Sequence, residues 1–303
     1  MSRFFWLIRR EIWEHKAIWV APMIVLACLL LAVITGNVHL GPIGKMDAST
    51  PLGSLPVQTQ VKLLLIAYAG LALVVFLVMG IVAFFYALDS LYADRRDRSV
   101  LFWKSLPLSD AETVLSKFAV AAIVIPLVAF VGALLAQVII AGGGAAKLAA
   151  AGLSGDIMWQ PEALVGGMTL AFLWCVTAIL WYSPVIAYLM LASAWAPKGP
   201  FLWAVLPPVA ISVLEIVLMH TSYAKDFVAQ RLFGLYRLLG SQDQTAAAAG
   251  NEVGDKLARI NGIDLAATLK GFYSSPELWL GVVAAGLLLA GAMWLRRYRD
   301  DTA

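Results

Sequence analysis

Residues 92–107 carry the side chains in this sequence that are best suited to binding another protein. The charged run YADRRDR is followed closely by the four hydrophobic residues VLFW, and Pro107 ends the segment. An apolar run beside exposed charges favours docking into a groove of a partner. We expect the docking residues to be Tyr92, Asp94, Arg95, Arg96, Asp97, Arg98, Val100, Leu101, Phe102, Trp103 and Pro107.

Residues that usually carry out catalysis or hold metal ions are scattered in this sequence. The three histidines have no ligand-like spacing, and the two cysteines lie inside apolar stretches, where thiols pack as small apolar groups. Gly142–Gly144 lacks the spacing of a phosphate-binding loop, so we expect it to form an outer turn. We therefore predict a non-enzymatic chain with no metal ion and no cofactor of its own.

Composition places the chain in a membrane. Of its 303 residues, 61% are hydrophobic and 14% are charged, and a helix needs roughly 20 apolar residues to cross a bilayer. We predict an all-α polytopic membrane protein with six transmembrane helices. Their expected ranges are Ala17–Thr35, Leu63–Leu88, Val114–Ile140, Leu164–Ala196, Phe201–Met219 and Leu278–Leu295, of which the fourth exceeds the thickness of a bilayer.

Lys and Arg residues predict the orientation. They are abundant near both termini and between the second and third predicted spans, whereas the two short loops opposite hold Lys45, Lys62 and Lys147. Because positive residues favour the cytoplasmic side, both termini and the bridge 89–112 are expected in the cytoplasm, with the chain in a bacterial inner membrane. Residues 220–276 then form an extracytoplasmic helical segment, which either caps an exit or lies on the outer leaflet.

The first 16 residues have the pattern of a helix lying in the membrane interface. Apolar residues recur at helical spacing, while Glu11 and its basic neighbours turn elsewhere. The residues assigned to this interfacial helix are Phe4, Phe5, Ile8, Arg9, Arg10 and Trp13.

A few polar residues and prolines interrupt the predicted spans. Glu215 is either an interfacial residue near the outer end of its span or a residue that contacts cargo or a second chain, and Gln137 and Thr177 are further candidates for that role. Pro126, Pro184 and the pair 207–208 are expected to bend or interrupt their helices.

The chain resembles the membrane subunit of type-2 ABC exporters. The resemblance rests on the amphipathic start, the charged stretch Tyr92–Arg98 and the turn SLPLS at residues 105–109, before Glu112 and Lys117. It implies one permease domain over residues 1–303, paired with a second copy, and a coupling helix in the bridge that sits in a cleft of a separate ATPase subunit.

The resemblance also implies how the assembly works. Two ATPase subunits would hold ATP and Mg²⁺ and drive an amphipathic or lipophilic cargo, such as a drug, peptide or lipid, out of the cytoplasm. Two alternatives stay open: a non-transporting ABC permease in antibiotic sensing or resistance, and an ion-coupled secondary transporter.

Overall fold

The computed structural model describes residues 3–35, 57–97, 109–150, 152, 154–240 and 270–299. Over these ranges the chain is helical and contains no strand, which confirms the predicted all-α class. The elements are α1 (Arg3–Glu14), α2 (Ala17–Thr35), α3 (Val57–Arg96), α5 (Asp110–Ala119), the π-helical turn η3 (Val120–Val124), α6 (Ile125–Ala150), the short 3₁₀ helix η4 (Asp156–Trp159), α7 (Pro161–Trp181), α8 (Ser183–Trp195), α9 (Pro200–Met219), α10 (Tyr223–Gly240) and α13 (Pro276–Arg299).

Six of the described helical stretches are long and apolar enough to cross a membrane, as predicted. They are Ala17–Thr35, Val57–Arg96, Asp110–Ala150, Pro161–Trp181, Pro200–Met219 and Pro276–Tyr298.

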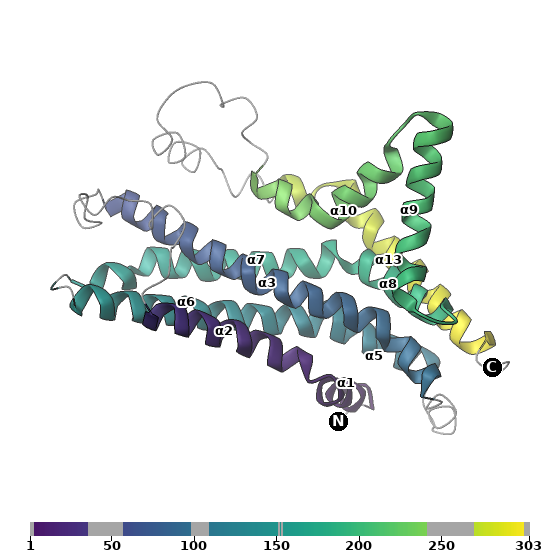
Figure 1. Ribbon diagram of the computed structural model, residues 1–303, viewed down its shortest axis with the longest axis horizontal. Helices are drawn as coiled ribbons and strands as arrows, with labels where there is room; N and C mark the ends of the chain where they lie inside the picture. The colour runs from purple at the N-terminus through teal and green to yellow at the C-terminus, as the bar shows by residue number, and fades with distance from the viewer. Residues whose placement is uncertain are drawn as a thin grey trace.

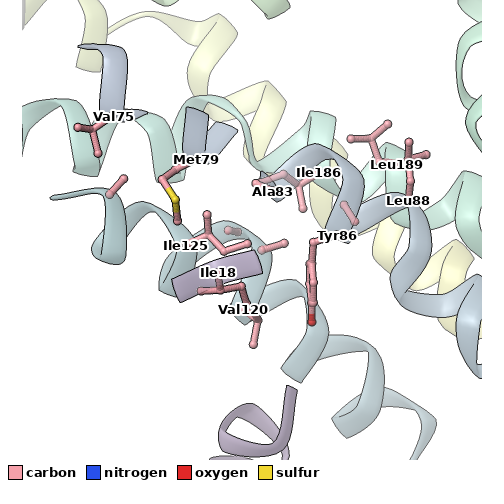
Figure 2. Packing of buried hydrophobic residues seen from close by; sticks show 14 of the residues in the cluster. Ile18, Val75, Met79, Ala83, Tyr86, Leu88, Val120, Ile125, Ile186 and Leu189 are labelled. Carbon is pink, nitrogen blue, oxygen red and sulfur yellow. The ribbon is translucent and has the colours of Figure 1, made fainter. Parts of the chain in front are cut away.

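The long helices α3, α6 and α7 run side by side and form the centre of the molecule (Figure 1), with α2 packed along α6 and α13 packed against α8. Buried aliphatic side chains from these helices form one continuous cluster, in which Met79, Ile125 and Ile186 meet (Figure 2). Because α3 has 40 residues, it is about 60 Å long and extends well beyond a hydrocarbon layer of about 30 Å. Its last turns therefore lie outside the membrane, next to the bridge.

The predicted fourth span is wrong as a single helix. The chain forms α7, breaks at Tyr182, and begins the 13-residue α8 at Ser183. Pro184 explains the break, because proline lacks the N–H that would continue the helical ladder and disfavours a helical residue before it. Since α8 is too short to cross a bilayer, the number of candidate spans stays at six.

Pro126 has a different effect from the interruption that we expected. Helical structure continues from Asp110 to Ala150, with the π-helical turn η3 directly before the proline. The π turn changes the hydrogen-bond register where the proline cannot donate, so the helix passes this position without ending. The carbonyl of Pro126 accepts a hydrogen bond from the thiol of Cys175 on α7, at 3.4 Å.

The glycines 142–144 do not form the predicted turn but belong to α6. Their role is close packing: a Cβ at Gly143 would overlap Cγ1 of Val33 on α2, at a separation well under 3.0 Å. A Cβ at Gly142 would meet its nearest neighbour, Trp159, at an ordinary 3.7 Å. The end of α2 can therefore approach α6 because residue 143 has no side chain.

These two glycines give a matched test of the packing. Gly143→Ala should destabilise the chain by about 1–3 kcal/mol, since the methyl group would overlap Val33. Gly142→Ala should be neutral or slightly stabilising, because alanine is the better helix former. Denaturant unfolding of the full chain in detergent measures both, and an equal effect of the two substitutions would contradict the close contact of α2 and α6.

Candidate functional site

The predicted bridge is described only at its two ends. Arg98, Val100, Leu101, Phe102, Trp103 and Pro107 lie outside the described residues. Tyr92, Asp94, Arg95 and Arg96 form the end of α3, Asp97 follows directly, and Ser109 resumes the chain at the other end. The candidate site is therefore built from the ends of the bridge and from the helices that contact them.

Ser109 starts α5 with a capping box. Its hydroxyl accepts a hydrogen bond from the Glu112 backbone N–H at 3.1 Å, and the Glu112 carboxylate accepts one from the Ser109 backbone N–H at 2.9 Å. Two otherwise unpaired helix N–H groups are satisfied in this way. The cap fixes where the bridge ends and where α5 begins.

Five charged side chains form what we call the ion-pair chain: Glu11, Lys117, Asp94, Arg296 and Asp110. Lys117 Nζ lies 3.0 Å from Glu11 Oε1 and 3.4 Å from Asp94 Oδ1. Arg296 continues the chain, with Nη1 2.9 Å from Asp94 Oδ2 and Nε 3.2 Å from Asp110 Oδ1. The ion-pair chain thus joins α1, α3, α5 and α13.

Four of the five charged side chains are buried, so their stability depends on these contacts. Glu11, Asp94, Lys117 and Arg296 are 2–6% exposed, while Asp110 is partly exposed. Removing charges from water is costly, so each buried charge needs its partner and its remaining hydrogen bonds. The three carboxylates exceed the two cations by one, and Glu11 gains a further donor from the hydroxyl of Tyr86, at 3.0 Å.

Tyr86 connects this polar cluster to the hydrophobic core. Its ring packs with the aliphatic cluster, and its hydroxyl extends out of that cluster toward α1 (Figure 2). The ring of His15 meets it edge-on with centroids 4.6 Å apart. A change at the ion-pair chain is therefore also felt by core residues of α3.

The N-terminal helix has an exposed side and a buried side, but Arg9 does not turn away from the exposed aromatic residues as the sequence pattern predicts. Phe5 and Trp13 are exposed, as expected for an apolar face offered to an interface, and Arg9 lies over the rings of Trp6 and Trp13. Phe4 and Ile8 are half-buried. Glu11 does turn away from the apolar face, and the structure shows that it turns into the protein.

Arg95 joins the end of α3 to α8 and the turn that follows it. Its guanidinium donates to the carbonyl oxygens of Ser193 and Ala196, and the Ser193 hydroxyl accepts from the backbone N–H of Tyr92 at 2.9 Å. Arg96, in contrast, is exposed and pairs with Asp97 at 3.0 Å. Arg95 thus has a structural role, whereas Arg96 and Asp97 are exposed residues of the bridge.

The arrangement allows a mechanical role for the bridge. Its leading end is bonded to α8 through Arg95 and to α13 through Asp94, and its trailing end is bonded to α1 and α13 through Lys117 and Asp110. A force applied to the bridge would therefore act on three helices outside it.

The described residues bring no three His, Cys, Asp or Glu side chains together in a way that could hold a metal ion.

Asp94 is among the predicted docking residues, whereas the structure buries it between two partners that the prediction misses. Lys117 and Arg296 counted as positive residues near helix ends, and Glu11 as an acid within a basic stretch. The sequence did contain a signal for these partners. A charged residue within one or two turns of the end of a long apolar helix is costly unless another group pairs with it. The pairing itself spans up to 202 positions of the chain, so it required the fold.

Glu215 lies at the junction of α9 and α10. Its carboxylate accepts hydrogen bonds from the Thr221 hydroxyl at 2.8 Å and from the backbone N–H groups of Tyr223 and Ala224 at 2.8 and 2.7 Å. A carboxylate at a helix N-terminus satisfies free N–H groups and complements the helix dipole. In this conformation Glu215 therefore fixes the turn into α10.

Thr177 and Gln137 are both buried, but they differ in whether the side chain has a hydrogen-bond partner. Thr177 is buried, with its hydroxyl 3.0 Å from the hydroxyl of Tyr273. Gln137 is completely buried in α6, and neither polar atom of its amide has a hydrogen-bond partner. The structure does not bring Glu215, Thr177 and Gln137 together by any contact among the described residues.

Helix α10 holds the break between α7 and α8. The Trp181 ring N–H donates to the Arg231 carbonyl at 3.0 Å, and the Tyr182 hydroxyl donates to that of Leu232 at 3.2 Å. The Arg231 guanidinium lies 4.4 Å from the Trp181 ring centroid and donates to the Glu277 carbonyl at the start of α13. Burial lowers the pKa of the Arg231 guanidinium.

The bridge lies inside a segment that matches a known family. Residues 57–143 match the ABC-2 family transporter protein model. This ABC-2 segment covers α3, the bridge, α5 and most of α6, and it confirms the resemblance over that part of the chain. It includes Asp94, Asp110 and Lys117 of the ion-pair chain, whereas Glu11 and Arg296 lie outside it. No curated protein and no solved structure matches the chain.

Lys117 gives the sharpest test of the ion-pair chain. Lys117→Met keeps the length of the side chain but leaves Glu11 and Asp94 short of their shared cation, so it should cost about 3–5 kcal/mol of unfolding free energy. Lys147→Met, at an exposed position of α6, should cost little. Denaturant unfolding in detergent measures both.

A double substitution separates the ion pair from the loss of the lysine itself. Adding Glu11→Gln to Lys117→Met should recover part of the loss, because the unpaired carboxylate is then neutral. Additive losses from the two substitutions would contradict a direct interaction between them.

Proposed function

We propose that this chain is the transmembrane subunit of an ATP-driven ABC exporter, which pairs with a second copy and moves an amphipathic or lipophilic cargo out of the cytoplasm. ATP and Mg²⁺ bind in separate ATPase subunits, which dock on the bridge 89–112. The ABC-2 segment supports an ABC transporter permease, and the ion-pair chain supports the way in which the bridge drives it.

The single observation that carries the proposal is the bonding of both ends of the bridge to helices outside it. A solvated turn would need no buried partners, yet Asp94 in the first part of the bridge and Lys117 just after it contact each other and reach α1 and α13. Movement of a docked ATPase would shift these ends together. The ion-pair chain would then pass that movement to α1 and α13 as a unit.

The exposed apolar surface of α9 supports pairing with a second copy. Within this 20-residue helix only Ala204 is buried, and large apolar residues are exposed along its whole length. Figure 1 shows α9 projecting from the bundle, with α10 turning back toward it. A second chain would cover a side of α9 that lipid alone covers in a single copy.

Adding charge to the apolar residues of the bridge tests whether the ATPase docks there. Replacing Phe102 and Trp103 together by Asp should leave membrane insertion intact but abolish capture of the partner ABC ATPase proposed above, since two charges would enter an apolar groove. Affinity purification of the full chain from membranes measures the capture.

Leu40 and Ile43, in the predicted outer loop, provide the control pair. The same replacements there should leave the ATPase bound. Normal capture by the variant at residues 102 and 103 would remove the bridge from its proposed role.

A further inference from the structure

Gln137 is the most unusual polar residue in the described bundle. It has no exposed surface, and neither Nε2 nor Oε1 has a hydrogen-bond partner. Hydrocarbon offers no water to satisfy an amide, so an unpaired one inside a membrane span is costly. Such a residue is expected where function, rather than stability, determines the side chain.

The surroundings of Gln137 are built from small residues. Ala133 lies one turn before it on α6, and Gly167 and Ala171 occupy the same spacing on α7. Ala133 and Ala171 pack with Ala72 of α3 in one buried cluster, bordered by Phe76 and Phe130. We call this region the α3–α6–α7 junction.

The amide of Gln137 points into this junction. A Cβ built on Gly167 would lie 3.1 Å from Gln137 Nε2 and 3.1 Å from Tyr68 Cβ, so the amide rests against the α7 backbone. The Tyr68 hydroxyl is directed elsewhere and donates to the Met158 carbonyl at 2.9 Å. The amide is therefore enclosed by apolar groups and by a tyrosine already engaged.

Opening of this junction would move α7 against α6, and the helix break after α7 lies at one end of that movement. Helix α7 ends at Trp181 and α8 begins a new helix, so α7 can shift against α6 without carrying α8 as a rigid extension. At the junction itself the facing residues Ala133 and Ala171 are small, and the contacts that such a shift must release lie beside it: the ring contact of Phe130 with Phe172, and the hydrogen bond from the Cys175 thiol to the Pro126 carbonyl. Opening would expose one acceptor and two donors of Gln137 between apolar walls.

We propose that the α3–α6–α7 junction is a cargo subsite for apolar molecules that contain amide groups, with Gln137 pairing to the N–H and C=O of a cargo amide. The inference rests on the exporter function proposed above and names its substrate class. An amide offers both a donor and an acceptor, whereas an ester offers acceptors alone. The small, apolar lining selects a cargo backbone flanked by hydrophobic groups, as in an apolar peptide.

The test uses the full chain with its ATPase subunits in lipid nanodiscs. The probe is an N-acetylated tetrapeptide of alternating leucine and phenylalanine that carries an N-methylated dansyl group through a C-terminal ester linker, compared with an analogue in which esters replace all of its amide bonds, the N-terminal one included. Gln137→Leu should weaken binding of the amide probe about tenfold, as expected for a lost hydrogen bond, and leave the ester analogue unchanged. Without probe, the Tm of Gln137→Leu should equal that of the wild type or exceed it by about 2–4 °C, because an unpaired buried amide is removed.

Gln60→Leu is the matched control. Gln60 is also a buried glutamine, but its Oε1 accepts a hydrogen bond from Gln160 Nε2 at 3.2 Å. This variant should lower Tm and bind the amide probe as the wild type does. Together the two variants separate a glutamine that stabilises the bundle from one that is kept for a ligand.

Three results would overturn the subsite: a wild type that does not bind the amide probe more tightly than the ester, an unchanged Kd in Gln137→Leu, or a Tm loss in Gln137→Leu as large as that in Gln60→Leu. ATPase capture is read in the same preparations. Retained capture with any of these results rejects the subsite alone, whereas a wild type that captures no ATPase rejects the exporter function.

Discussion

Lys117 is the cation on which the polar end of this molecule depends. Its ammonium group is almost fully buried between the carboxylates of Glu11 and Asp94, so the three side chains are stable in the protein only together. Because the three residues come from α5, α1 and α3, the position of each helix end depends on the other two. Arg296 extends the same constraint to α13, the last described helix.

The apolar part of the bundle complements this constraint. Small residues let α2 and α7 approach α6 closely, as at Gly143 and along the α3–α6–α7 junction, and these contacts contain no charges. The molecule therefore combines a tightly paired end with a middle held by van der Waals packing, which is the weaker hold between helices in lipid. The break at Tyr182 and the contacts of α10 with Trp181 lie between the two.

Hydropathy was sufficient to predict the helical class and the number of spans, because both depend on local sequence. Local patterns failed where the same residue type has two uses. Glycines 142–144 suggested a turn but provide close packing, and prolines 207–208 suggested a possible interruption but lie inside the continuous helix α9, whereas Pro184 does interrupt its span. The partners of Asp94 and the isolation of Gln137 were beyond prediction, since both follow from helices that are distant in the chain.

The π-helical turn η3 lies between Lys117 and Gln137 in one continuous helix. A π turn holds one residue more than an α turn, and one residue corresponds to a rotation of about 100° about the helix axis. The extra residue therefore sets the angle between the direction in which the buried lysine points and the direction in which the buried amide points. A helix of the same composition with ordinary α register throughout would still cross the membrane, but its two polar side chains could not both face their present neighbours. The π turn before Pro126 therefore fixes the orientation of Lys117, at the paired end, relative to Gln137, in the middle of the bundle.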